Sequence, residues 1–308
     1  WEFSQPCLPV ECHAETMFSK VILCPHGRKM LQIGRKTSPT FLRARELSTD
    51  SKNREERNLE SDDQDGIDGD EDLLQKRLYP EHIPTSTFQK MLLAVGSSAL
   101  SLASPWRADM IATMGEVTGL QSIKYMHSRM VSDPTGRQIL RERPRINSRT
   151  VDLKYLKTLP EGTFGHEYIT FLEENNITPD LRRPVTFVDD PELAYVMQRY
   201  REVHDLVHTV VGMPTTMLGE VCVKWIEGLQ LRLPLGITGG LFGAVRLLPK
   251  QREMYHSTHL PWALRVGKNA KFLMNIYYEH HWEQPMDEFR KEMNIEQPPY
   301  TPKPLKKS

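Results

Sequence analysis

The sequence contains little cysteine: 4 residues in 308, three of them before residue 25 and the fourth at Cys222. Small secreted domains that cannot build a large core are usually held together by several disulfide bonds. A folded body with a single cysteine has no such framework. The composition therefore excludes a disulfide-stapled scaffold and favours a reducing compartment.

The chain also lacks a long hydrophobic run. A membrane-spanning helix needs roughly 18–20 consecutive apolar residues. The nearest segments are Met91–Trp106, which is diluted by serine, and Leu233–Val245, which stops at Arg246. We therefore predict that the chain does not span a bilayer, while binding to a bilayer surface stays open.

Net charge is absent as well, because 40 Lys and Arg residues balance 40 Asp and Glu residues. Proteins that bind nucleic acid usually carry a clear basic excess that meets the phosphate backbone. We therefore expect no nucleic-acid partner. The neutral total nevertheless hides two segments of uneven charge in the N-terminal quarter of the chain.

The first of these segments is basic. Between Met17 and Arg45 there are seven basic residues and no acid, and the basic residues are Lys20, Arg28, Lys29, Arg35, Lys36, Arg43 and Arg45. Serine, threonine and scattered large apolar residues fill the gaps, a composition typical of a mitochondrial transit peptide. An ordinary basic tail is the alternative. We predict that residues 1–45 are an N-terminal extension and transit peptide, with Met17 as the start of the natural protein.

The second segment is acidic. Residues 46–72 hold twelve acids against three bases and almost no apolar side chain. Such a run cannot bury enough surface to offset the entropy lost on ordering. We therefore predict a disordered linker over residues 46–77, a folded body over 78–300 and a basic tail over 301–308.

The body is predicted to be all-α and a single domain, because its apolar residues follow the helical period and no segment alternates like a strand. The expected helices are Thr87–Ala103, Arg107–Val117, Ile123–Val131, Arg137–Glu142, Asp152–Lys157, His166–Asn175, Pro191–Val211, Met217–Leu231, Leu235–Leu248 and Leu260–Met274. Asp133–Gly136 is expected to form a turn. The clearest helix start is at Asp190-Pro191, because aspartate is a favoured cap and proline is favoured at the first helical position.

One group of residues suggests metal chemistry. His204 and His208 are four residues apart on the predicted helix 191–211, so both imidazoles lie on one face and can reach one ion. Asp205 is a neighbour on the same helix. Glu220 lies beyond the turn Gly212–Pro214, which would fold the next helix back and bring Glu220 to the same cluster. Two imidazoles and two carboxylates suit zinc, and also iron or manganese.

The pair of histidines alone is a weak signal, since it also arises by chance in a chain with 11 histidines. Two features strengthen it. His204 and His208 interrupt an apolar stripe, where an unpaired polar group is costly. Both carboxylates also lie at a workable spacing.

The residues around this cluster resemble the ubiquinone (coenzyme Q) biosynthesis protein 4 family. The resemblance extends over roughly Tyr79 to Pro299 and is carried by Phe187–His208, Gly212–Thr215, Gly219-Glu220, Val223–Trp225, Arg143–Ile146 and Leu159–Gly162. The family's motif is a His-Asp pair, a second His after two residues and a Glu after eleven more. It is intact here, so the resemblance implies Zn²⁺ held by His204, Asp205, His208 and Glu220.

The same resemblance implies a peripheral protein on the matrix side of the mitochondrial inner membrane, working with other proteins of the coenzyme Q biosynthetic complex. The implied activity is that of a carboxy-lyase. It removes the C1 carboxylate from 4-hydroxy-3-methoxy-5-polyprenylbenzoate, with or without coupled hydroxylation at that carbon. The alternative is a non-catalytic, lipid-binding scaffold with a structural zinc. Four protein ligands are typical of a closed structural site, whereas a carboxylate ligand that shifts would open one. A homo-oligomer stays open.

Two further features have alternative interpretations. The segment Leu233–Leu248 places Gly236 and Gly240, and also Gly239 and Gly243, at the spacing of close helix packing. A groove for the polyprenyl tail or a lipid-binding surface is the alternative. Arg141, Arg143 and Arg145 are expected to be solvated surface residues, and a clamp for the benzoate carboxylate is the alternative.

Overall fold

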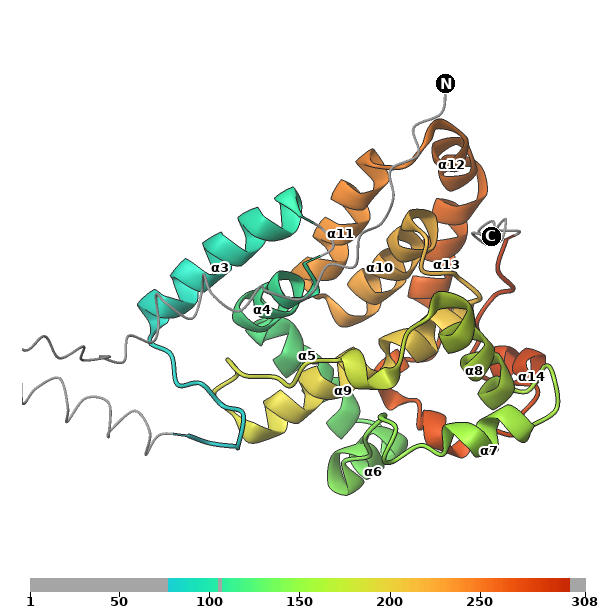
Figure 1. Ribbon diagram of the computed structural model, residues 1–308, viewed down its shortest axis with the longest axis horizontal. Helices are drawn as coiled ribbons and strands as arrows, with labels where there is room; N and C mark the ends of the chain where they lie inside the picture. Colours follow the sequence, from blue (N-terminus) through green and yellow to red (C-terminus); the bar gives the residue numbers. More distant parts are fainter. Residues whose placement is uncertain (1–76, 105–106, 300–308) are drawn as a thin grey trace, which may run out of the picture. The chain divides into compact units, whose positions relative to one another are not determined.

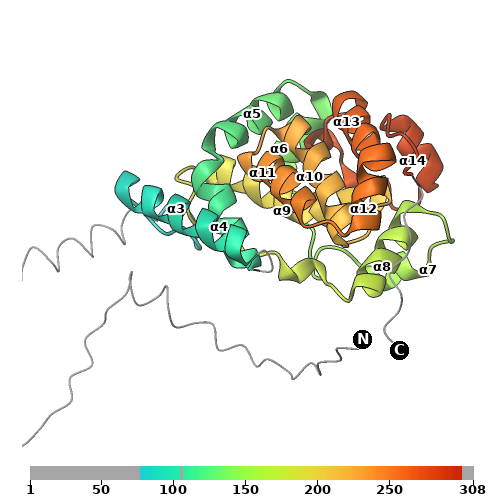
Figure 2. The same ribbon diagram turned by 90° about the horizontal axis from the view of Figure 1, so that it is seen from above.

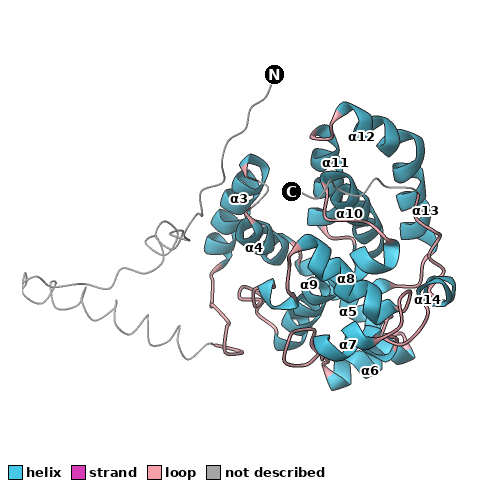
Figure 3. Cartoon of the chain, turned by 45° about the vertical axis from the view of Figure 1, so that its right-hand side comes forward, coloured by secondary structure: helices cyan, strands magenta, loops and turns pink. Residues whose placement is uncertain are grey.

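The computed structural model describes residues 77–104 and 107–299. Within these ranges every regular element is a helix, and the one β-type contact is an isolated bridge between Thr163 and Pro285 (Figure 3). The predicted all-α class is therefore confirmed, and the described residues form one helical domain. The predicted extension 1–45, the linker up to residue 76 and the tail 301–308 lie outside the described residues.

The helices follow one another along the chain with short connections (Figure 1). They are α3 (Thr87–Ala103), α4 (Ala108–Thr118), α5 (Leu120–Val131), α6 (Pro134–Glu142), α7 (Leu153–Thr158), α8 (Phe164–Asn175), η1 (Pro179–Leu181), α9 (Pro191–Val211), α10 (Met217–Leu231), α11 (Pro234–Val245), α12 (Pro249–Met254), η2 (Tyr255–His259, a π-helix), α13 (Leu260–Asn269), η3 (Leu273–Asn275), η4 (Tyr278–His280) and α14 (Met286–Glu292). Of the described helices, none combines the length and the hydropathy needed to cross a membrane.

Helix α9 forms the core of the domain. Asp190 caps its start by accepting hydrogen bonds from the backbone N–H groups of Glu192 and Leu193, at 2.8 and 2.9 Å. Gly212, with φ of +67°, ends it in the left-handed conformation that glycine adopts without strain. Every residue from Leu193 to Val211 is buried, because α5, α8, α10 and α14 pack around this helix.

Helix α10 turns back from α9 after only a few residues. The side chain of Thr216 caps the first turn by accepting from the backbone N–H of Gly219. A Cβ atom at Gly219 would lie 2.0 Å from the carbonyl oxygen of Pro214, so the tight turn requires glycine there. The result is that the first turns of α10 lie close to the last turns of α9.

Helix α11 packs closely against α10, side by side with it in Figures 1 and 2. A Cβ atom at Gly236 would lie 2.8 Å from backbone atoms of Gly228, and one at Gly240 would lie 2.9 Å from the ring of Trp225. The expected role of these glycines in close packing is therefore confirmed. The opposite side of α11 is exposed and apolar, and its exposed residues are Ile237, Leu241, Phe242 and Val245.

We expect Gly236→Ala to destabilise the domain by about 1–3 kcal/mol, the usual cost of overpacking. The added methyl group would meet backbone atoms of Gly228, which cannot move aside as a side chain can. Gly239→Ala is the matched control, since its nearest neighbour is the flexible chain of Lys224, 3.3 Å away. Urea unfolding measures both variants. Equal stabilities would contradict the packing interpretation.

Several predicted boundaries are wrong. Asp133–Gly136 is not a free turn, because the Asp133 side chain caps Gly136 and Pro134 occupies the first position of α6. Helix α11 ends at Val245 rather than Leu248, and α13 ends at Asn269 rather than Met274. The short helices α12 and α14, and the π-helix η2, were not predicted, since a helix of one or two turns shows no clear period.

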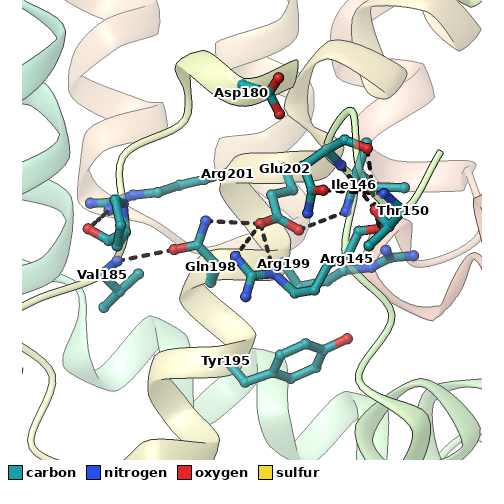
Figure 4. A network of polar contacts seen from close by, with 12 residues as sticks. Arg145, Ile146, Thr150, Asp180, Val185, Tyr195, Gln198, Arg199, Arg201 and Glu202 are labelled. Atoms are coloured by element: carbon teal, nitrogen blue, oxygen red, sulfur yellow. Dashed lines mark hydrogen bonds and ion pairs between the residues drawn. The ribbon is translucent and has the colours of Figure 1, made fainter. Parts of the chain in front are cut away.

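A buried carboxylate ties the segment 143–151 to α9 (Figure 4). Glu202 accepts a hydrogen bond from Arg145 Nε at 2.8 Å and one from the backbone N–H of Ile146 at 2.9 Å. Gln198 donates a further bond to the same carboxylate at 3.0 Å and accepts one from the backbone N–H of Val185. Arg145 thus serves as the counter-ion of Glu202 rather than as a solvated surface residue.

Candidate metal centre

The last turns of α9 and the first turn of α10 bring three side chains to one point. One ligand atom each of His204, His208 and Glu220 lies within 4.8 Å of the other two. The two imidazole rings are perpendicular, with their centroids 4.8 Å apart. Both histidines are buried, and Glu220 is partly exposed. The predicted i, i+4 face and the predicted return of α10 together produce this arrangement.

The Nε2 atoms of both histidines face the carboxylate of Glu220. His208 Nε2 lies 3.5 Å from Oε1 of Glu220, and His204 Nε2 lies 3.8 Å from Oε2. These distances exceed the usual range of 2.7–3.2 Å for an N–H···O hydrogen bond. The three groups therefore point at a common space without binding each other tightly.

The opposite nitrogen of each ring is held by a strong acceptor. His208 Nδ1 lies 2.9 Å from the carbonyl oxygen of Met213, and His204 Nδ1 lies 2.6 Å from Oε1 of Glu227. A carbonyl and an ionised carboxylate can only accept, so both Nδ1 atoms carry the proton. In the neutral rings, both Nε2 atoms therefore present a lone pair toward Glu220.

Two lone pairs and a carboxylate that converge in a buried place repel each other unless a cation lies between them. Within the described part of the chain, His208 Nε2 has no hydrogen-bond partner although it is buried. Imidazole nitrogen and carboxylate oxygen are common ligands of divalent metals, and zinc sites often pair a ligating histidine with a second carboxylate, as His204 pairs with Glu227. The residues present therefore fit a divalent metal ion.

Glu227 is the hub of the surrounding hydrogen bonds. Besides His204, its carboxylate accepts from the hydroxyl of Tyr200 at 3.1 Å and from Lys224 Nζ at 3.0 Å. Our sequence analysis did not assign a role to any of these supporting residues. A usable signal was present, because Glu220, Lys224 and Glu227 recur at i, i+4 and i+7 along one face of α10.

The charges around the site favour ionised carboxylates. Burial alone would raise the pKa of Glu220, but His208, His204 and Lys224 outweigh it and hold that pKa well below its usual range. The pKa of Glu227 is lowered in the same way, against its burial, by His204 and Lys224. Burial lowers the pKa of His204, so this ring is neutral near pH 7 and able to act as a ligand.

Asp205, the fourth predicted ligand, lies outside the group of three. Its carboxylate is buried and accepts hydrogen bonds from Arg182 through both oxygens, with Nε of Arg182 3.3 Å from Oδ2. The structure thus brings together three of the four predicted residues. Metal ligation by Asp205 stays a prediction.

Comparison with known proteins identifies a family. The sequence profile described as "Coenzyme Q (ubiquinone) biosynthesis protein Coq4" matches residues 79–299. A Bombyx mori protein named "Ubiquinone biosynthesis protein COQ4 homolog, mitochondrial" is 57% identical over 213 residues, covering 69% of this chain and 82% of the relative. The Homo sapiens protein of the same name is 50% identical over 222 residues, covering 72% of this chain and 84% of the relative.

One solved structure has a similar fold. It is the crystal structure of a candidate ubiquinone biosynthesis protein from Nostoc punctiforme, with a TM-score of 0.54. The match covers 69% of this chain and 99% of the other, at 20% sequence identity. At that identity the likeness supports the helical fold alone.

Proposed function

Because the chain belongs to the coenzyme Q (ubiquinone) biosynthesis protein Coq4 family, we propose that it is a metal-dependent carboxy-lyase of ubiquinone biosynthesis. The proposed reaction removes the C1 carboxylate from 4-hydroxy-3-methoxy-5-polyprenylbenzoate. The observation that carries the proposal is the convergence of His204 Nε2, His208 Nε2 and the Glu220 carboxylate, with each imidazole fixed from behind. Zinc is the metal we propose for this site.

The proposed setting is the matrix side of the mitochondrial inner membrane, where the protein would work with other proteins of the coenzyme Q biosynthetic complex. The curated relatives are named as mitochondrial, which supports the organelle. Exposed apolar side chains support contact with lipid or with a partner: Phe88, Met91, Leu92 and Val95 on α3, and Ile237, Leu241, Phe242 and Val245 on α11. Arg246 donates a hydrogen bond to the carbonyl of Leu102 and so links the ends of these two helices.

The chemistry needs an anion to be bound and a proton to be delivered. Loss of carbon dioxide from a para-hydroxybenzoate breaks the bond between C1 and the carboxyl carbon, and a proton takes the vacated position on the ring. A bound divalent metal would supply a Lewis acid for an anionic oxygen of the substrate. His204, His208 and Glu220 would hold it. Glu227 fixes the tautomer of His204, and Lys224 balances the charge of Glu227.

Turnover by the purified full chain tests the proposal. The substrate is the analogue 4-hydroxy-3-methoxy-5-prenylbenzoate, labelled with ¹³C at the carboxyl carbon, and zinc content is measured on the same sample. We expect labelled carbon dioxide from the metal-loaded protein and none after chelation. Inclusion of oxygen as a variable separates simple decarboxylation from decarboxylation coupled to hydroxylation. No carbon dioxide from fully loaded protein, with and without oxygen, would contradict the proposed activity.

The alternative is a non-catalytic scaffold that binds lipid and organises the biosynthetic complex around a structural zinc. The exposed apolar residues of α3 and α11 favour it, since large apolar patches mark binding surfaces. A scaffold needs the metal only for folding. Its assembly function should therefore survive any change at the metal centre that leaves the fold intact.

A further inference from the structure

We propose that the metal centre has three protein ligands, His204, His208 and Glu220, and that Asp205 is held away from it by Arg182. The fourth position is then left for an anionic oxygen ligand, and we assign it to the carboxylate of the substrate. The identity of that carboxylate rests on the proposed function. The three-ligand set does not, because it rests on side-chain contacts alone.

The contact between Arg182 and Asp205 is complete from both sides. Arg182 uses Nε and Nη2 to reach the two oxygens of Asp205, which is the paired geometry that arginine forms with carboxylates. The Asp205 side chain is 3% exposed, so no water is at hand to replace Arg182. If the carboxylate of Asp205 left Arg182 to bind a metal, the guanidinium, itself only 32% exposed, would lose its partner.

The geometry of α9 explains why Asp205 is directed elsewhere. Successive residues of an α-helix are turned by about 100°, so the residue after His204 leaves the face that His204 and His208 share. Arg182 follows η1 and meets Asp205 on the neighbouring face. Glu220, on the other hand, faces both imidazoles from α10. The His-Asp pair in the sequence therefore serves two different contacts.

The charges beside the site leave room for one anion. Arg182 neutralises Asp205, and Lys224 neutralises Glu227. A divalent cation held by Glu220 and two neutral imidazoles therefore keeps one formal positive charge. Zinc sites with three protein ligands and one exchangeable position are typical of catalysis. A carboxylate in that position would complete the charge balance, whereas a neutral phenol would not.

The first test removes the ion pair as a whole. Arg182→Gln with Asp205→Asn takes away both charges, so no unpaired charge stays buried and the fold is expected to survive. The full chain is loaded with Co²⁺ and dialysed, and its cobalt content is measured. We expect the double variant to keep its cobalt, with affinity within about 10-fold of wild type, while Glu220→Gln loses it. Loss of cobalt from a folded double variant, to the same extent as from Glu220→Gln, would overturn the three-ligand set.

The second test addresses the fourth position through the visible absorption of bound Co²⁺, which depends on its ligands. Titration of the wild-type Co²⁺ protein with 4-hydroxy-3-methoxybenzoate should change the spectrum, and 2-methoxyphenol, which lacks the carboxylate, should not. In Arg182→Gln the released Asp205 should occupy the position, so the carboxylate response should be lost. A wild-type spectrum that ignores the benzoate, or responds equally to the phenol, would overturn the assignment.

These outcomes are separate from the proposed activity. A protein that binds the benzoate carboxylate at cobalt and yet releases no carbon dioxide would contradict the carboxy-lyase proposal while leaving the three-ligand centre intact. Carbon dioxide release together with loss of cobalt from the folded double variant would do the reverse.

Discussion

His208→Ala is expected to remove the bound zinc while most of the helical domain stays folded. His208 is almost fully buried, and its Nε2 atom is one of two imidazole ligand atoms in the group of three. Its loss leaves His204 and Glu220, too few ligands to retain zinc during dialysis. The ring also stacks on Phe171 and binds the carbonyl of Met213, so we expect a stability loss on the order of 3 kcal/mol, comparable to other large-to-small core changes.

His259→Ala is the matched control for this experiment. His259 is also fully buried, and its Nδ1 atom likewise lies near a backbone carbonyl, that of Met254 at 3.1 Å. It is not part of the metal group. Elemental analysis should find zinc in His259→Ala and little in His208→Ala, while far-ultraviolet circular dichroism finds both helical. Zinc content equal to wild type in His208→Ala would contradict the site. Complete unfolding on metal loss alone, seen in chelated wild type, would favour the scaffold.

The metal group could be predicted from the sequence because its geometry is local. Two histidines four residues apart share a helix face in any α-helix, and the short turn Gly212–Pro214 limits where the next helix can go. What surrounds the group could not be predicted in this way. Arg182 reaches Asp205, and Lys224 and Tyr200 reach Glu227, only once the helices are packed. The number of charges in the sequence does not reveal these pairings.

The fold shows the same division. Helix α9 was predicted at both ends, because Asp190-Pro191 and Gly212 are capping signals that act within a few residues. The Asp133-Pro134 start of α6 carries the same signal but was interpreted as a turn, since glycine and proline also favour turns. Helices α12 and α14 are too short to show a period, and they depend on packing against the rest of the domain.

Glu220→Gln is expected to abolish ubiquinone synthesis in cells that lack the endogenous protein. The substitution nearly preserves the shape of the side chain but removes the one charged ligand among the three. Two neutral imidazoles and an amide oxygen bind a divalent metal far more weakly than a set with a carboxylate. Polyprenylated benzoates that still carry the C1 carboxylate should accumulate, which a quinone profile by mass spectrometry detects.

The decisive comparison is between that profile and the state of the biosynthetic complex in the same cells. Glu220→Gln leaves the exposed apolar residues of α3 and α11 unchanged, so a pure scaffold with this substitution should still assemble the complex and restore ubiquinone. Glu173→Gln, an exposed carboxylate paired with Lys157, controls for the loss of a negative charge and should rescue fully. Lost ubiquinone with an assembled complex would favour the enzyme. Normal ubiquinone with Glu220→Gln would end the claim of a catalytic metal, because no other carboxylate joins His204 and His208 in the metal group found among the described residues.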